Sequence, residues 1–473
     1  MKNIAFLVSA NKTIIFQKVA SGLLHDGYES FWISPSQNWT NWLLKKGVLK
    51  KNILNIPEKI LNVNSKPLTK DEKNKISIIE NSCNISFRDI YLMDRVLRDK
   101  NVDYAFSYML CCYKEILCFL VDNKVISVFS EQTWNFEIIT TLACNTLNVD
   151  SFYVDSVRVP DGVKFGRFAF FRGYLMDTLP SENKVDKKNL LFAKEFLLQF
   201  RNEKKGTSYL NTYFVKPSLS FKLLKKFVMH IQYFYNDKYD ITRQSLYFLV
   251  IYRLRQFYNI LHIRFFMSYY PIKSIRKKYI FIALHKEPDS ALDVQSSSFL
   301  NQFEAVKAFI RKVPSNYEVI VKDHSHALGL NSNNKYKKLS KLPFVRIVNP
   351  MSDTFSLISK ASMVFSIGGT VSLEAALMGK RSVTVSKKFF SEILMRDAID
   401  PFCCSTNEVQ KILDGSPPTD EKLLNYLAKI HANSFKGLLF DPTSHEIYRS
   451  NDNMNNLYVG FKEFLEKHKS NEA

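Results

Sequence analysis

The chain has 473 residues, more than one hydrophobic core usually organises, so two domains are expected. Hydrophobic residues make up 46% of it and charged residues 23%, a balance that excludes a disordered chain. The formal net charge of +21 favours a polyanionic partner. Because no zinc-finger, basic-zipper or RNA-recognition motif accompanies that charge, nucleic acid is not expected as the partner.

Cysteine usage and hydropathy indicate a cytoplasmic location. The seven cysteines form neither a Cys-x-x-Cys pair nor a metal-ligand spacing, so we expect free thiols, no metal site and no cofactor. The apolar run after Lys2 is too short for a signal peptide, and no run of 18 apolar residues predicts a transmembrane helix.

The first elements in chain order predict a parallel sheet. Residues 4–8 read as a buried strand, 14–27 as an amphipathic helix that ends at Gly27, and 28–34 as the next strand. Further strands are predicted at 102–108 and 124–130. Glu131 follows the last of these, at the strand end where open parallel sheets form their ligand crevice.

Residues 218–279 differ from the rest of the chain in charge and pattern. Twelve Lys and Arg stand against two acids, Asp237 and Asp240, and apolar residues interleave with them at mostly helical spacing. A basic amphipathic helix of this kind suits the surface of an anionic membrane. A helical insert that packs on its own protein, with its basic residues solvated, explains the same pattern.

From residue 279 the alternation of strands and helices returns. The predicted fold class is α/β, with two Rossmann-like doubly wound domains, a central cleft and a basic helical insert. The predicted domains are 1–182, 183–278 and 279–450, followed by a C-terminal helix and tail at 451–473. The strands predicted in the third of these segments are 279–285, 317–324, 344–350, 363–367 and 382–386, and the helices are 298–313, 354–360 and 371–380.

A glycine turn follows the strand at 363–367. Gly368 and Gly369 allow a tight turn, and Thr370 and Ser372 open a helix whose free N–H groups suit a phosphate oxygen. Glu374, one turn further, either accepts a hydrogen bond from a ribose hydroxyl or caps the helix start. An ordinary strand-to-helix turn has the same pattern.

Two more polar clusters follow predicted strands of the same domain. Lys322 and His324 end the strand at 317–324 and together can neutralise a diphosphate or phosphodiester. His285 and Glu287 follow the strand at 279–285 and would face the same crevice. His324 and His326 lack a third nearby ligand, so a metal site is not predicted.

These motifs resemble the capsule polysaccharide biosynthesis proteins, a family that includes the bacterial Kdo transferases of capsule linkers. Its members typically read Lys-x-His-Pro where this chain has Ser325 in the last position. The resemblance covers about 1–175 and 279–460. It is carried by His285-x-Glu287-Pro288, Asn301-Gln302, Val321-Lys322-x-His324, Gly369-Thr370-x-x-Leu373-Glu374 with Gly379-Lys380, Ser130-Glu131-x-x-Trp134-x-x-Glu137, Arg158-Val-Pro-Asp-Gly162 and Arg167-Phe-Ala-Phe-Phe171.

The resemblance implies a GT-B-like glycosyltransferase of capsule or surface-polysaccharide synthesis. Such an enzyme transfers a sugar from a nucleotide-sugar to a glycan or lipid-linked acceptor. A CMP-sugar is favoured, because related enzymes contact that nucleotide through a His and a Ser/Thr-rich helix start, here His324 and the Thr370/Ser372 pair. The chain has no Asp-x-Asp metal motif at a strand end, which agrees with metal-independent transfer.

The other expected site residues lie in the N-terminal half. Glu131 is the first candidate for general base or nucleophile, although an acid at a helix start is common. Asp161 is the second candidate, although Pro-Asp-Gly is itself a strong turn signal. Arg158 and Arg167 either hold an anionic acceptor or are solvated loop residues.

Three other functions remain open at this stage. A CDP-polyol phosphotransferase of teichoic-acid-type polymers has a similar Lys-x-His motif, but it needs a second catalytic His, and the N-terminal portion offers only His25. A sugar-nucleotide 2-epimerase has two such domains but no use for the basic segment. A non-catalytic, membrane-docked assembly factor is favoured by Ser325. If the protein transfers a sugar to such an acceptor, we expect it in the cytoplasm, peripherally bound to the inner face of the cytoplasmic membrane.

Overall fold

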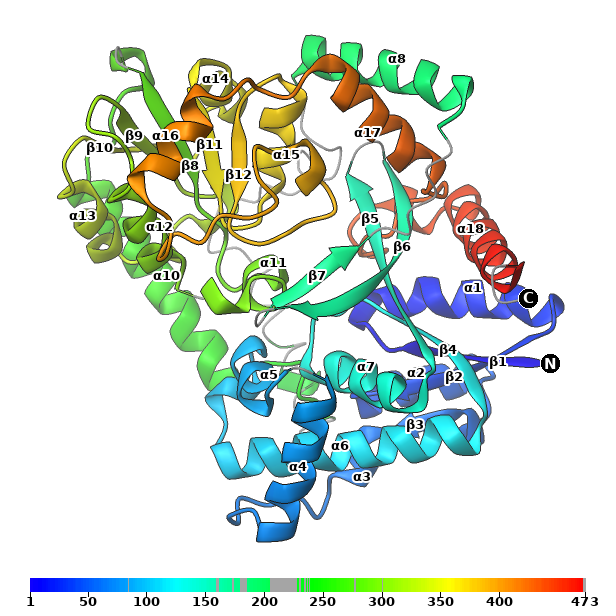
Figure 1. Ribbon diagram of the computed structural model, residues 1–473. Coiled ribbons are helices and arrows are strands. Elements are labelled where there is room, and N and C mark those ends of the chain that lie inside the picture. Colours follow the sequence, from blue (N-terminus) through cyan, green and yellow to red (C-terminus); the bar gives the residue numbers. More distant parts are fainter. Residues whose placement is uncertain are drawn as a thin grey trace.

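The protein consists of two α/β units, each built on its own sheet (Figure 1). The computed structural model describes residues 1–83, 85–158, 161–171, 174–178, 185–204, 228, 231–233, 235, 237, 239–275, 278–299 and 301–470. For 158, 161–162, 164–171, 174–178, 266 and 469–470 the description covers the backbone only. The predicted α/β class with two Rossmann-like sheets is confirmed.

The first unit begins with the predicted strand–helix–strand. Strand β1 (Lys2–Leu7) pairs in parallel with β2 (Tyr28–Ser34), and α1 (Thr13–His25) connects them. The helix buries residues at 15, 16, 19, 20 and 23, which is the spacing of one helical face. Gly27 follows with φ of +84°, a left-handed conformation that glycine adopts without strain, so the chain reverses there.

Five parallel strands and an edge hairpin make up the first sheet. Its order is β3-β2-β1-β4-β5-β6-β7. The parallel strands are completed by β3 (Ile53–Asn55), β4 (Val125–Ser130) and β5 (Asp150–Arg158), and the antiparallel hairpin consists of β6 (Asp161–Phe171) and β7 (Tyr174–Thr178).

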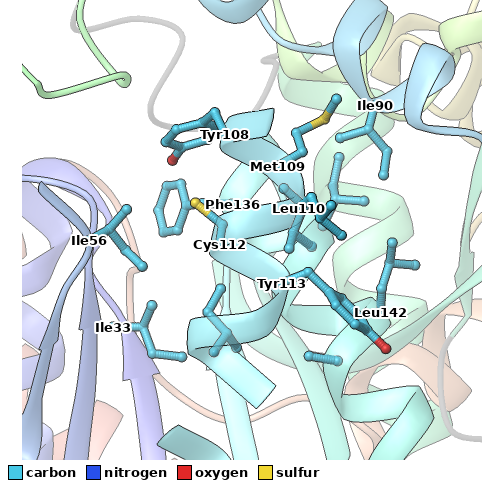
Figure 2. Close-up of a cluster of buried hydrophobic side chains, with 14 of the residues drawn as sticks. Ile33, Ile56, Ile90, Tyr108, Met109, Leu110, Cys112, Tyr113, Phe136 and Leu142 are labelled. Carbon is cyan, nitrogen blue, oxygen red and sulfur yellow. The ribbon is translucent and has the colours of Figure 1, made fainter. Parts of the chain in front are cut away.

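The strand predicted at 102–108 is wrong, because this segment is the start of helix α6 (Val102–Asp122). The Asn101 side chain caps the helix by accepting a hydrogen bond from the N–H of Tyr104 at 3.1 Å. Figure 2 shows Tyr108, Met109 and Cys112 of α6 beside Phe136 in the core of the first unit. Residues 102–122 have the apolar spacing of a helix that is buried on one face. The segment 102–108 alone is too short to show this helical period.

Among the described residues, α6 has the length and composition of a membrane-crossing helix, with a mean hydropathy of 1.4 over its best window. A core helix that is largely buried in its own protein has the same length and composition, so the expectation of no transmembrane helix stays a prediction. Of that window, 44% is buried within the protein, where α6 packs against α7 (Asn135–Leu147).

The second sheet has five parallel strands in the order β10-β9-β8-β11-β12. Its strands lie where they were predicted: β8 (Tyr279–Ala283), β9 (Glu318–Lys322), β10 (Val345–Val348), β11 (Met363–Ser366) and β12 (Ser382–Thr384). The helices of this unit include α11 (Ser290–Asp293), α12 (Gln302–Ile310), α13 (Asn333–Ser340), α14 (Thr354–Lys360), α15 (Thr370–Leu377) and α16 (Thr406–Asp414).

The C-terminal helix α18 (Asn451–Ser470) returns to the first unit and lies along α1 (Figure 1). Phe461 packs against Phe6 and Phe16 in the core of that unit. The remaining described helices are α2 (Gln37–Lys45), α3 (Ile56–Lys59), α4 (Lys70–Cys83), α5 (Phe87–Met93), α8 (Lys187–Glu203) and α17 (Asp420–Ala432).

Helix α10 (Leu246–Phe266) connects the two units. Ile241, just before it, lies in the core of the first unit, and Ile263, near its end, lies in the core of the second. The predicted helical character of the basic segment is confirmed for α10, whereas 205–227 lies outside the described residues. The predicted domain boundaries stay predictions. All seven cysteines are free, and four of them, Cys83, Cys112, Cys144 and Cys404, are buried.

Candidate functional site

The strand order of each sheet fixes where a ligand crevice forms. In the first sheet the chain runs outward from β1 to β2 and β3, then returns to the other side of β1 with β4. In the second sheet β9 and β10 lie on one side of β8, and β11 on the other. Loops that diverge at the carboxyl ends of such central strands leave a crevice between them. Glu131 follows β4, His285 follows β8, and Gly368 follows β11 shortly after its end.

One cavity of about 650 Å³ opens at these strand ends and has walls from both units. Its volume is typical of a site for a small-molecule ligand. The predicted residues that line it are Glu131, His285, Lys322, His324, Gly368, Gly369, Thr370 and Glu374. The structure therefore brings the Lys322–His324 loop and the Gly368–Thr370 turn to one cavity, together with an acid from the other unit.

Lys322 contributes a largely buried ammonium group to the cavity wall. It is the last residue of β9, and its side chain forms no ion pair or hydrogen bond within the part of the chain that the structure describes. Burial lowers the pKa of Lys322, and the carboxylates of Asp323, Glu374 and Asp353 partly oppose that shift. A buried cation that forms no direct ion pair is unfavourable in the free protein and suits an anionic ligand.

His324 presents an N–H group beside Lys322. Its Nδ1 accepts a hydrogen bond from the backbone N–H of His326 at 3.1 Å, so in the neutral ring the proton sits on Nε2. Burial, with help from neighbouring cationic and imidazole groups, lowers the pKa of His324 to about 4. The ring is thus a neutral hydrogen-bond donor at neutral pH.

Asp323 lies at the cavity wall between Lys322 and His324 and fixes the loop. Its carboxylate accepts hydrogen bonds from the Tyr336 hydroxyl, the Asn331 amide at 3.1 Å and the N–H of His324 at 2.8 Å. Burial raises the pKa of Asp323 to about 6 despite these donors. The strand end therefore holds Lys322 and His324 in place through its own buried network.

His285 ties the loop after β8 to the glycine turn. Its Nε2 accepts a hydrogen bond from the N–H of Gly368 at 3.1 Å, and burial lowers its pKa to about 4. Neither Gly368 nor Gly369 has the left-handed backbone conformation for which a tight turn often needs glycine. The turn instead needs space: a Cβ at position 368 would lie 2.5 Å from Cε of Lys388, and one at 369 would lie 3.3 Å from the His285 ring.

The first turn of α15 faces the cavity with open donors. Gly369 precedes the helix without a side-chain cap, and the N–H groups of Thr370 and Val371 have no acceptor among the described residues. The predicted phosphate contact of Ser372 is not found, because Ser372 is fully buried and does not line the cavity. Its hydroxyl contacts that of Ser366 at 2.9 Å and donates to the carbonyl of Val383 at 3.1 Å, so it stabilises the turn from inside.

The two predicted donor-site glutamates lie in different places. Glu374 lines the cavity one turn into α15, in keeping with a ligand contact. Glu287 lies outside the cavity lining and accepts hydrogen bonds from Gln302 at 2.7 Å and from Lys335 at 3.3 Å. Gln302 also bonds the backbone of His285, so Glu287 supports the loop after β8 and has no place in direct ligand contact.

Glu131 forms the facing wall from the first unit. Its carboxylate pairs with Lys12, from the loop after β1, and accepts a hydrogen bond from Ser9 Oγ at 2.5 Å. Beneath it, Glu137 caps the start of α7 and is fully buried. Burial and the neighbouring Glu131 raise the pKa of Glu137 to about 7, although backbone N–H groups of Thr133, Glu131 and Trp134 oppose the shift.

The remaining predicted residues lie in the β5–β6 hairpin. Arg158 ends β5 and Asp161 begins β6 opposite it, while Arg167 lies further along β6. The side chains of these three residues lie outside the described part of the chain. Their predicted roles in acceptor binding and catalysis stay predictions.

Sequence reasoning missed several cavity residues, above all Lys12, Asp155 and Lys388. Lys12 and Lys388 follow the strands β1 and β12, so the rule that singled out Glu131 could have found them. Lys388 is largely buried and donates a hydrogen bond to the side chain of Gln295 at 2.9 Å. Asp155 lies inside β5, a strand that the sequence pattern did not reveal. In the part of the chain that the structure describes, no group of three or more His, Cys, Asp or Glu side chains could hold a metal ion.

Comparison with known proteins finds similar folds and no similar sequence. No protein-family model and no curated protein matches the chain. Among solved structures, KpsC from Thermosulfurimonas dismutans, a beta Kdo 2,4 transferase, is 11% identical, with a TM-score of 0.35 over 64% of this chain and 79% of that one. Acinetobacter baumannii MurG is 11% identical, with a TM-score of 0.29 over 91% and 98% of the two chains.

A UDP-GlcNAc 2-epimerase from Methanocaldococcus jannaschii, in complex with UDP-GlcNAc and UDP, is 14% identical, with a TM-score of 0.27 over 91% of this chain and 99% of that one. The similarity to these three structures is low both in sequence identity and in TM-score.

Proposed function

We propose that this protein is a glycosyltransferase that moves a sugar from a nucleotide-sugar to a glycan or lipid-linked acceptor in surface-polysaccharide synthesis. The observation that carries the proposal is the composition of the cavity. Lys322, the donor side of neutral His324 and the open first turn of α15 share one wall, and the carboxylate of Glu131 stands on the other.

The second unit would bind the nucleotide phosphate. Backbone N–H groups at a helix start, together with a cation that forms no direct ion pair, form a binding site for a phosphate group. As the bond between sugar C1 and the phosphate oxygen breaks, negative charge collects on that oxygen. Lys322 and the His324 N–H would stabilise this charge. Because both groups are already buried and held by the Asp323 network, little reorganisation is needed during the reaction.

The first unit would activate the acceptor. Glu131 would accept the proton of the acceptor hydroxyl while the acceptor oxygen forms its new bond to C1. Lys12 and Ser9 hold the carboxylate, so its orientation is fixed before substrate binds. The nucleotide leaves with the phosphate oxygen, and the proton of the acceptor hydroxyl stays on Glu131.

Phosphotransfer fits the cavity less well than glycosyl transfer. The residues that the described part of the first unit contributes to the lining include Lys12, Glu131, Thr133, Tyr153 and Asp155, and none of them is a histidine. A phosphotransferase of the predicted kind would need one there to take a proton. The carboxylates in that position support a sugar acceptor with a hydroxyl nucleophile.

The identity of the nucleotide is tested by thermal shift. CMP, UDP, GDP and CDP are each added to the purified protein, and a nucleotide at 100 times its dissociation constant should stabilise it by about 2.7 kcal/mol. We expect CMP to give the largest shift and Lys322→Gln to remove it. The matched control is Lys338→Gln, a charge removed from the exposed surface of α13, which should keep the shift. If no nucleotide stabilises the protein, or Lys322→Gln keeps the full shift, the proposal is wrong.

A further inference from the structure

Helix α10 buries two polar residues against the second unit and leaves a row of large apolar side chains exposed. Its buried side carries Gln256 and Asn259, whose side-chain amides donate hydrogen bonds to the carbonyls of Leu328 at 3.1 Å and Gly329 at 2.9 Å. These polar residues fix the helix to the loop that follows His326. The packing is close, because a Cβ at Gly329 would lie 2.5 Å from Ile260.

The solvent side of α10 is apolar along its whole length. Exposed side chains recur every three or four residues, which places them on one face of the helix. Leu254 is 62% exposed and Phe265 is 71% exposed. The stripe consists of Tyr247, Val250, Ile251, Leu254, Phe257, Tyr258, Leu261 and Phe265. An exposed apolar stripe of this length is rare on a soluble surface and marks a contact with another apolar phase or partner.

The charges beside the stripe have one sign. Arg253, Arg255 and Arg264 are exposed, and the sequence 246–266 contains no Asp or Glu. The wider segment from 218 to 279 holds twelve Lys and Arg against two acids. Of those two acids, Asp237 is buried and bonds Ser36 and Asn38 of the first unit, so it does not offset the charge of α10.

We infer that α10 lies flat on an anionic lipid bilayer, with its apolar stripe in the interface and its arginines on the headgroups. Helices that lie in a membrane interface combine an apolar face with basic residues at its margins, and tyrosine side chains suit the headgroup level. Three arginines in 21 residues make α10 unsuited to crossing the bilayer. Pairing of α10 with a second copy would bring six arginines together without an acid, which disfavours a dimer through this face.

The position of α10 ties the membrane to the cleft. Figure 1 shows α10 running between the two units, toward α12 and α13. The loop at Leu328–Gly329, against which it packs, continues directly from the Lys322–His326 segment that lines the cavity. Resting on the proposed function, this places the cleft near the lipid surface, where a lipid-linked acceptor would be presented.

Vesicle sedimentation tests the inference on the full chain. The protein is mixed with vesicles of pure phosphatidylcholine and with vesicles of equimolar phosphatidylcholine and phosphatidylglycerol. We expect sedimentation with the anionic vesicles, loss of most binding in the double variant Leu254→Glu, Phe265→Glu, and about fivefold weaker binding for Arg255→Gln. The matched control is Leu191→Glu, Leu198→Glu on α8, whose leucines are 60% and 65% exposed.

The outcomes separate this inference from the proposed function. The α10 double variant should keep the nucleotide-induced thermal shift, which also shows that it folds. The inference is overturned if the wild type does not sediment with anionic vesicles, or if the α8 control loses as much binding as the α10 variant. It is equally overturned if the lipid-free wild type is a dimer that the α10 variant converts to a monomer, because the stripe would then be an interface between copies.

Discussion

The two walls of the cleft differ in how their charged groups are satisfied. On the wall from the second unit, Lys322 and the first turn of α15 have no protein partner among the described residues. On the wall from the first unit, Glu131 is already paired with Lys12 and bonded by Ser9. Under the proposed function, a bound anion completes the first arrangement, whereas the second is complete in the free protein. We therefore propose that the wall of the second unit provides affinity for the nucleotide and that the wall of the first unit provides the catalytic base.

Substitution of Glu131 on the wall of the first unit should lower turnover more than any other change proposed here. Glu131→Gln keeps the shape of the side chain but removes its ability to accept a proton, so turnover of the donor should fall by about 10²–10⁴-fold. The dissociation constant of the nucleotide, measured by calorimetry, should stay nearly unchanged. The matched control is Glu115→Gln, which removes the partner of Lys59 on the outside of α6. Full turnover in Glu131→Gln would contradict the assignment of chemistry to this wall.

Substitution of Lys322 on the wall of the second unit should weaken nucleotide binding and at the same time stabilise the ligand-free protein. Lys322→Gln removes a charged hydrogen bond to phosphate, so the nucleotide should bind about 10–100-fold more weakly by calorimetry. The ligand-free variant should be more stable by about 1 kcal/mol in chemical denaturation, because a buried ammonium that forms no direct ion pair is lost. A variant that binds weakly because it is destabilised would show that Lys322 has a structural role.

A smaller effect concerns the buried glutamate beneath Glu131. Since the pKa of Glu137 is raised to about 7, the folded protein binds a proton there at pH values where the unfolded chain has released it. Its contribution to the free energy of unfolding is therefore present below about pH 4.5 and lost as the pH rises through 7. Relative to Glu137→Gln, the wild type should lose about 3 kcal/mol of stability between these limits. Parallel pH profiles of the two proteins, from urea unfolding, would argue against a proton on Glu137.

Much of the fold follows from short-range patterns in the sequence. The strands and helices of the second unit lie where their alternation predicts them, because parallel strands buried on both faces are continuous apolar runs bounded by turns. The same alternation put Lys322, His324, Gly368 and Glu131 at strand ends, and the structure places all four on one cavity. The strand-end rule is physical, so it extends to residues such as Lys12 and Lys388 that the motif comparison overlooked.

The predictions that failed concern properties that depend on what a segment packs against in the folded protein. The window at 102–108 has the composition of a strand, and only the capped helix around it reveals its period. Ser372 has a hydroxyl suited to phosphate, yet its direction is set by the neighbouring Ser366 and Val383. Glu287 follows a strand end, but Gln302 and Lys335 draw it away from the cavity. Direction and burial of single side chains are tertiary properties, so a pattern in the sequence cannot fix them.

A crystal structure of the protein with bound CMP would show whether both loops of the second unit hold the same phosphate group. We expect the phosphate to lie between Nζ of Lys322 and the N–H groups of Thr370 and Val371, with Nε2 of His324 within hydrogen-bond distance. A nucleotide bound anywhere else, or a phosphate that contacts only one of the two loops, would contradict it.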